Sequence, residues 1–295
     1  MHRLHRLLPI TLLLLLAPWP GRTGTPSPPA SLPIAAERSG TGTVDLVLVP
    51  GLSGGDVSWE ETATRLSSRY RVHRIQLTGL ESASADVASV RTIDGFADAL
   101  VAYLQHNARH PVVLIGHSAG GVASMLVAIR QPRLVERLVI VDALPFMSAN
   151  RGDTRVDDDL RGRIAAEARD MLGQDAAAFE SRMREQASSA VGSPDVAIRI
   201  AQGGMRSDRK TYAALYESLS ITDLRNEIGR LRSPPTVIFA DQSPLGAPAG
   251  HMLRRYQAQY AGSQARLVEI KDARHYVMLD QPGDFAHALD SALID

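Results

Sequence analysis

PVVLIGHSAGGVASMLVAI, from Pro111 to Ile129, places a lone serine between glycines directly after four apolar residues. The apolar run from Val112 to Ile115 predicts a buried strand. Apolar residues then recur with helical spacing and form a stripe that would lie on a sheet: Val122, Met125, Leu126 and Ile129. Ser118 therefore falls in a tight turn between a strand and an amphipathic helix.

The glycines around Ser118 fit the needs of such a turn. The chain must reverse sharply, which forces the serine into a strained backbone conformation and lifts its hydroxyl clear of the sheet. Side chains two residues before and two residues after the serine would collide, so glycine is needed at Gly116 and Gly120. The helix that follows presents partial positive charge, which favours a developing anion. The pattern predicts that Ser118 is a nucleophile.

Strand-like runs recur along the chain with helical segments between them. Near-continuous apolar strands that alternate with helices indicate a mostly parallel central sheet with helices on both faces. We expect strands over Val44–Pro50, Tyr70–Leu77, Val112–Ile115, Arg137–Ala143, Thr236–Ala240 and Ala265–Ile270.

One stretch interrupts this alternation. From about residue 145 to residue 232 there is no strand-like run, and helical patterns replace it. The strands resume at Thr236, which favours a helical cap inserted into one α/β domain of residues 43–295 over a second independent domain.

The first 42 residues do not read as part of that domain. Residues 1–20 combine basic residues with a short apolar run, the layout of a secretory signal peptide, so we expect export to the periplasm or the extracellular space. An uncleaved membrane anchor is the alternative, but the run is shorter than the roughly 20 apolar residues that span a bilayer. Residues 21–42 are rich in Pro, Gly, Ser and Thr and read as a linker.

Charge and composition exclude several function classes. Among 295 residues, 32 are Lys or Arg and 32 are Asp or Glu, so no net positive charge points to nucleic acid. The absence of cysteine excludes disulfides and thiolate metal sites. No His, Asp and Glu cluster has metal-ligand spacing, and no glycine-rich loop fits a phosphate. We expect no cofactor, no metal, no stable membrane partner beyond export, and a small acyl compound as substrate.

A serine hydroxyl needs a base to accept its proton. The sequence has nine histidines, and His275 is the strongest candidate because it follows the last expected strand. Loops at the carboxyl ends of strands form the site in open α/β sheets, and the Ser118 turn lies at the same end. His117 adjoins the serine and is expected to point away from it, and the remaining histidines read as surface or packing residues.

With Ser118 first and His275 last, the chain resembles the α/β-hydrolase family, specifically its cap-bearing serine hydrolases. VPGLSGG (Val49 to Gly55) resembles the loop that supplies half of the family's oxyanion hole, with Pro50 in place of the usual histidine. Matched by position, the resemblance implies that the backbone N–H groups of Leu52 and Ala119 stabilise the carbonyl oxygen as it becomes negative.

The resemblance leaves the acid of the triad open. Many relatives place an aspartate in a Gly-x-x-Asp turn after the strand that here reads TVIFA, but position 243 is Ser243. Asp241 lies earlier in the same loop, and Asp142 ends the previous strand, where some relatives carry their acid. We favour Asp142 because the loop at that strand end also opens toward the site.

These residues predict a serine hydrolase that cleaves a carboxylic ester through an acyl-enzyme, using Ser118, His275 and Asp142. Amides, lactones and carbon–carbon bonds beside a ketone are alternative substrates for the same triad. A non-catalytic binding protein on this scaffold is the alternative from another class. Epoxide and haloalkane hydrolysis are disfavoured, because relatives with those activities carry aspartate at the Ser118 position.

Overall fold

A computed structural model describes residues 33–81, 90–109 and 111–294. The expected signal peptide (residues 1–20) and residues 21–32 of the expected linker lie outside this range. None of the helices in the described range is both long enough and apolar enough to cross a membrane.

The strands are β1 (Ile34–Ser39), β2 (Asp45–Val49), β3 (Arg71–Leu77), β4 (Val112–His117), β5 (Val135–Val141), β6 (Thr236–Ala240) and β7 (Arg266–Ile270).

The helices are α1 (Gly55–Ser58), α2 (Glu60–Leu66), α3 (Ile93–Asn107), α4 (Ala119–Arg130), α5 (Asp158–Gly173), α6 (Ala176–Ala190), α7 (Pro194–Arg206), α8 (Arg209–Ile221), α9 (His251–Gln259), α10 (Val277–Asp280) and α11 (Pro282–Ile294). Short 3₁₀ turns are η1 (Met147–Arg151), η2 (Ile228–Arg230) and η3 (Ser243–Leu245).

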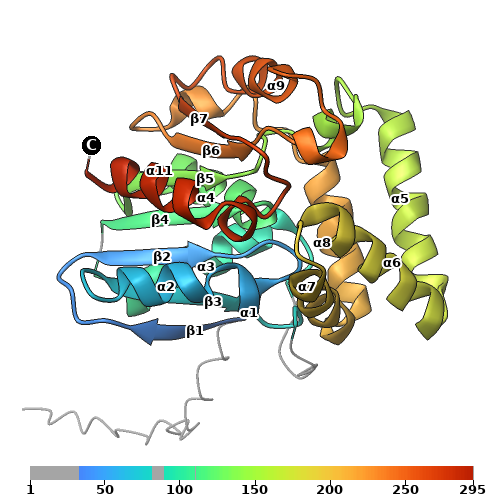
Figure 1. Cartoon of the computed structure of the whole chain (residues 1–295), viewed down its shortest axis with the longest axis horizontal. Coiled ribbons are helices and arrows are strands. Elements are labelled where there is room, and N and C mark those ends of the chain that lie inside the picture. Colours follow the sequence, from blue (N-terminus) through green and yellow to red (C-terminus); the bar gives the residue numbers. More distant parts are fainter. Residues whose placement is uncertain (1–32, 82–89, 110, 295) are drawn as a thin grey trace, which may run out of the picture. The chain divides into compact units, whose positions relative to one another are not determined.

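The seven strands form one sheet in the order β1-β3-β2-β4-β5-β6-β7. Strands β2 to β7 pair in parallel, and all six strands expected from the sequence are present. The predicted α/β sheet is therefore confirmed. Because the parallel strands share a direction, the loops after β2, β4, β5, β6 and β7 emerge at one edge of the sheet, as the arrowheads in Figure 1 show.

Strand β1 was not expected, and it overlaps the predicted linker of residues 21–42. It pairs antiparallel with β3 at the edge of the sheet, where Glu37 lies opposite Arg74 and forms an ion pair with it. Its side chains are mostly exposed, and Ile34 alone among them is buried. An exposed edge strand has no apolar run, so its formation depends on β3 rather than on a local pattern.

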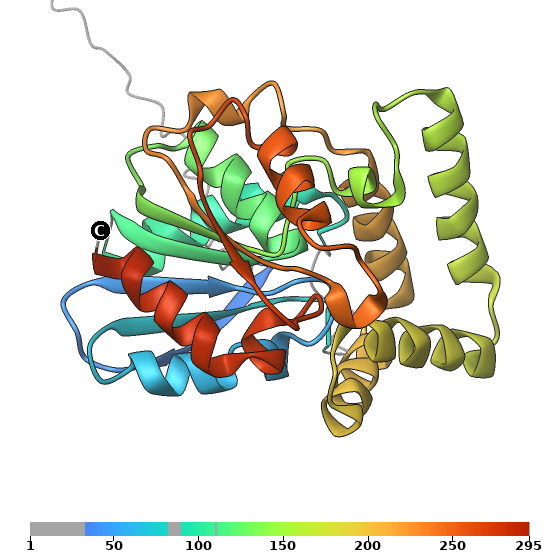
Figure 2. The same ribbon diagram turned by 45° about the horizontal axis from the view of Figure 1, so that its top comes forward.

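Helices cover both faces of the sheet. Figures 1 and 2 show α2 and α11 on one face, with α3 and α4 on the other. The rings of Trp59, at the start of α2, and Phe285, in α11, lie 6.3 Å apart between centroids. Trp59 is fully buried in the core. Helix α9 packs on the face of α4, where Tyr260, just after α9, approaches Met125.

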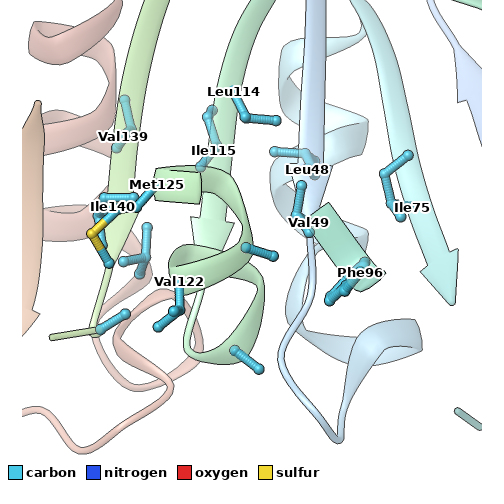
Figure 3. Packing of buried hydrophobic residues seen from close by; sticks show 14 of the residues in the cluster. Leu48, Val49, Ile75, Phe96, Leu114, Ile115, Val122, Met125, Val139 and Ile140 are labelled. Carbon is cyan, nitrogen blue, oxygen red and sulfur yellow. The ribbon is translucent and has the colours of Figure 1, made fainter. Parts of the chain in front are cut away.

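The core lies between α4 and the central strands. Figure 3 shows Val122 and Met125 of α4 beside Ile115 of β4 and Ile140 of β5. None of these four side chains is more than 1% exposed. Burial of each contributes about 1.5–3 kcal/mol relative to exposure. The helical stripe predicted after Ser118 thus holds α4 on the sheet and fixes the turn before it.

Between β5 and β6 the chain forms helices α5 to α8 and no strand, which confirms the expected helical insertion. Figure 1 shows these helices beyond the carboxyl ends of the parallel strands. The insertion is joined to the rest of the fold at several points: Arg199 pairs with Glu60, and the backbone N–H of Ile93 donates to Ser218. The insertion therefore stands over the edge at which the predicted site residues gather.

Candidate active site

Ser118 occupies the turn between β4 and α4 in a backbone conformation that L-residues rarely adopt, with φ 53° and ψ −124°. Its neighbours hold this conformation: the amides of Gly121 and Val122 donate to its carbonyl, and its own amide donates to the carbonyl of Val141 at 3.0 Å. The Ser118 residue is 9% exposed and lines a cavity. The strained serine turn predicted from the sequence is therefore confirmed.

Both flanking glycines are required sterically: Gly116 by the turn itself, as the sequence suggested, and Gly120 by the loop after β2, which the sequence did not suggest. A β-carbon on Gly116 would overlap the carbonyl oxygen of Gly120. A β-carbon on Gly120 would overlap the carbonyl oxygens of Pro50 and Val49, at the end of β2. The turn is thus packed against both its own strand and the adjacent loop.

Asp142 and His275 meet at the same edge of the sheet. Nδ1 of His275 lies 2.7 Å from Oδ2 of Asp142, and the acid side chain is 4% exposed. The other carboxylate oxygen, Oδ1, accepts hydrogen bonds from the amide of Ala240 at 3.0 Å and the hydroxyl of Tyr256 at 3.1 Å. An ionised carboxylate satisfied in this way makes Nδ1 the protonated nitrogen of His275 and leaves Nε2 as the acceptor.

Asp241, the other candidate acid, is placed differently. Its Oδ1 accepts hydrogen bonds from the amide and the hydroxyl of Ser243, and the residue does not line the cavity of Ser118. The geometry therefore joins His275 to Asp142 and leaves Asp241 within its own turn.

The loop after β2 runs beside the serine. A β-carbon on Gly51 would lie 3.1 Å from Cβ of Ser118, so the loop backbone passes close to the hydroxyl. The next residue, Leu52, lines the cavity. Tyr276 holds this loop in place, because its hydroxyl donates to the carbonyl of Ser53 at 2.8 Å. Within the described residues, the backbone amides of Leu52 and Ala119 donate to no protein acceptor and are free to bind a ligand oxygen.

His117 lies beneath His275 rather than at the surface. It is fully buried, its ring centroid lies 4.6 Å from that of His275, and its Nε2 donates to the His275 carbonyl at 3.1 Å. Burial, with a further contribution from the neighbouring His275, lowers the pKa of His117 well below its usual value. A neutral His117 therefore supports the backbone of His275 from below.

A cavity of about 640 Å³ opens over these residues. Its size falls in the range of small-molecule sites. Its wall includes Leu52, Ser118, Asp142 and His275 from the sheet edge, together with residues of the helical insertion and of α9. A ligand in this cavity would contact the serine, the histidine and the insertion at once.

The loop that carries His275 is bonded to the insertion on both sides of the histidine. The Asp280 carboxylate accepts hydrogen bonds from the amide of Arg274 at 2.8 Å and from that of Gly192, between α6 and α7, at 2.7 Å. The Arg274 guanidinium donates to the carbonyls of Ser188 and Val191, and the amide of Tyr276 donates to the carbonyl of Ala190. We call Ser188–Gly192, at the end of α6 and before α7, the junction turn.

Four residues on or beside the cavity wall were not predicted from the sequence: Asn150, His251, Arg255 and Tyr256. His251 was read as a surface or packing residue, yet it lines the cavity together with Arg255. The two are four residues apart at the start of α9 and share a helix face. That spacing, in a helix that follows a strand end, was the available signal.

Within residues 33–81, 90–109 and 111–294, no group of three His, Asp or Glu side chains is arranged to hold a metal ion. The chemistry that this site can support is nucleophilic. It combines a strained serine, a histidine oriented by a buried carboxylate, and two free backbone amides near the serine.

Comparison with known proteins places this geometry in a family. Residues 46–288 match the model of the alpha/beta hydrolase family. A pimeloyl-acyl-carrier-protein methyl ester esterase of Aliivibrio fischeri is 27% identical over 64% of this chain and 72% of its own length. The strigolactone esterase RMS3 of Pisum sativum is 24% identical over 86% of this chain and 94% of its own length.

Among solved structures, an esterase from Exiguobacterium antarcticum aligns with a TM-score of 0.73 and 17% identity, covering 89% of this chain and 96% of that one. At this identity the match supports the fold alone. The family match spans most of the sheet, the serine turn and the His275 loop. The chain belongs to the α/β-hydrolase family.

Proposed function

We propose that the protein is a serine hydrolase that cleaves carboxylic esters, with Ser118 as nucleophile, His275 as base and Asp142 as the acid that orients His275. The observation that carries the proposal is the hydrogen bond of 2.7 Å between His275 and Asp142 on the wall of the cavity that Ser118 also lines. The relatives named above are called esterases, which supports an ester as substrate.

The reaction begins at the serine. Oγ of Ser118 attacks the ester carbonyl carbon while Nε2 of His275 accepts the hydroxyl proton. Asp142 accepts the Nδ1–H of His275, which fixes the tautomer with a free Nε2 and stabilises the imidazolium that forms. The negative carbonyl oxygen is stabilised by the backbone N–H groups of Leu52 and Ala119.

Collapse of this intermediate breaks the bond to the alcohol oxygen. The alcohol takes the proton from His275 and leaves an ester between the acyl group and Ser118. A water molecule then gives a proton to His275, attacks the acyl carbon, and releases the carboxylic acid with a restored Ser118 hydroxyl. Every step uses side chains and amides of this chain.

Labelling with a fluorophosphonate tests the proposal directly. The probe should form a covalent adduct on Ser118 of the folded protein, located by mass spectrometry of the digested protein. Ser118→Ala should abolish the adduct and lower ester turnover by up to about a millionfold. Ser189 is a matched control, because it lines the same cavity from α6 and Ser189→Ala should label normally. An unlabelled wild-type protein with native circular dichroism would exclude the nucleophile.

A further inference from the structure

One part of the cavity wall is mainly apolar, and another part carries polar side chains. Helices α6 and α7 contribute mainly apolar side chains, among them Met183, Ala187, Ile200 and Ala201. The η1 turn, the loop after β6 and α9 contribute polar groups, among them Asn150, Gln242, His251 and Arg255. A ligand that fills the cavity would therefore have both an apolar part and a polar part.

Arg255 is the distinctive group on the polar wall. Its guanidinium donates to the backbone carbonyl of Asn150 at 3.0 Å and lies 3.1 Å from Nε2 of His251. Because an arginine donates hydrogen bonds and has no acceptor, Nε2 of His251 accepts this hydrogen bond. The contacts of Arg255 hold the guanidinium in place, but none of them neutralises its charge.

No carboxylate in the described residues pairs with Arg255. Two arginines of the insertion are paired with acids, Arg151 with Glu167 and Arg163 with Asp153. Asp142 is the one acid on the described cavity wall, and its oxygens are engaged by His275, Tyr256 and Ala240. Arg255 thus brings a positive charge to the wall of the cavity that Ser118 lines, and no carboxylate of the described residues forms an ion pair with it there.

We propose that Arg255 binds a free carboxylate of the substrate, so that the ester cleaved at Ser118 belongs to a molecule that also carries a carboxylic acid group. This inference rests on the proposed esterase function. A guanidinium matches a carboxylate in both geometry and charge, since two parallel N–H groups meet two oxygens and one positive charge meets one negative charge. A phosphate dianion carries two negative charges, and Arg255 is the one Lys or Arg on the described cavity wall, so a singly charged carboxylate matches it better.

Matched esters test the inference. The monomethyl esters of succinate, glutarate and adipate carry a free carboxylate, and the corresponding carboxamides have nearly the same shape without the charge. We expect kcat/KM, measured by titration of the released acid, to be about ten- to hundredfold higher for the carboxylate form of the best-fitting chain length. A ratio near one in the wild-type protein would overturn the inference.

Variants locate the effect at Arg255. Arg255→Gln should bring the ratio of the two kcat/KM values down to about one, and Arg255→Lys, which keeps the charge but loses the planar fork, should give an intermediate ratio. Arg254→Gln removes the same charge from the exposed neighbour, which does not line the cavity, and should keep the wild-type ratio. Equal losses in the Arg254 and Arg255 variants would overturn the inference in favour of a long-range charge effect.

The outcomes separate the two proposals. Failure of the fluorophosphonate to label Ser118 refutes the esterase itself. Labelling at Ser118 combined with a wild-type ratio near one, or with cleavage of neither series, leaves the esterase standing and removes the carboxylate site. If Arg255→Gln does not fold, as judged by circular dichroism, the wild-type ratio and the Arg255→Lys variant decide.

Discussion

The hydroxyl of Tyr256 lies 3.1 Å from Oδ1 of Asp142, whose other oxygen lies 2.7 Å from Nδ1 of His275. Tyr256 is buried in α9, outside the strand ends that carry the proposed triad. Burial, with the negative charge of Asp142 as the next cause, raises the pKa of Tyr256 well above its usual value, so the phenol stays protonated and donates. Tyr256 is therefore a positioning residue for the acid.

Replacing Tyr256 should weaken this arrangement. We expect Tyr256→Phe to lower kcat by about threefold to tenfold, since a hydrogen bond to a charged group contributes more than one between neutral groups. Steady-state kinetics on a neutral ester measure the effect, which should fall on kcat rather than on KM. Tyr260→Phe is the control, because the Tyr260 hydroxyl donates to the carbonyl of Ala143 and not to Asp142. A Tyr260→Phe loss as large as that of Tyr256→Phe would contradict the positioning role.

The two candidate acids are distinguished by the activities of their asparagine variants. Asp142→Asn should lower kcat by about ten-thousandfold, because the amide can orient the wrong tautomer of His275 and cannot stabilise the imidazolium. Asp241→Asn should remain within about tenfold of the wild type, since Asp241 is bonded to Ser243 and does not line the cavity. Ester turnover by both variants, checked for folding by circular dichroism, decides. A severe loss in Asp241→Asn alone would reverse the assignment.

Glycine substitutions distinguish the tight serine turn from open helix surface. Gly116→Ala places a β-carbon against the carbonyl oxygen of Gly120 and should lower the free energy of unfolding by about 1–3 kcal/mol or more. Gly162 lies within α5 with nothing within 4 Å of the added carbon. Gly162→Ala should raise that free energy by about 0.5–1 kcal/mol. Urea denaturation measures both changes, and equal effects of the two substitutions would refute the steric account of the turn.

Acid should destabilise the fold through His117. The pKa of this buried ring is lowered in the folded state, so below pH 6.5 the unfolded chain binds a proton that the folded chain does not. The contribution of neutral His117 to the free energy of unfolding is therefore fully present above pH 6.5, and it declines as the pH falls toward the lowered pKa of His117. The slope is at most about 1.4 kcal/mol per pH unit for this one group.

Unfolding at several pH values tests this linkage. His117→Asn, which keeps a neutral donor beside the His275 carbonyl, should reduce the dependence of the unfolding free energy on pH below pH 6.5. His106→Asn alters an exposed histidine and should leave the dependence nearly unchanged. A slope that His117→Asn does not reduce would show that another group causes the acid sensitivity.

Those features of the fold and site that depend on local residue patterns could be predicted from the sequence. Strands buried on both faces, the glycines around Ser118 and the position of His275 each follow from residue order, and the fold agrees with them. The choice between Asp142 and Asp241 was different, because it depends on which loop reaches the histidine in space. The order of residues along the chain suggests which of the two aspartates is the better candidate, but it does not give the distance between the loops in the folded protein.

Two features lay beyond local patterns for physical reasons. Strand β1 forms because β3 offers a free edge, and Glu37 finds Arg74 only after that pairing. Arg255 resembles other helical arginines in the sequence, since its significance comes from its place on the cavity wall without an ion-pair partner in the described structure. Both properties belong to neighbours that are distant along the chain.

The hydrogen bonds between the His275 loop and the junction turn couple the position of His275 to the position of the insertion. Asp280 and Arg274 form hydrogen bonds that join the residues around His275 to the junction of α6 and α7. A displacement of that junction would therefore either break these hydrogen bonds or move His275. We therefore expect a substrate that contacts the insertion far from its scissile bond also to hold His275, the proposed base, in place. Affinity for the remote part of a substrate is in this way converted into order at the reacting atoms, and substrates cut short on that side should turn over more slowly as well as bind less tightly.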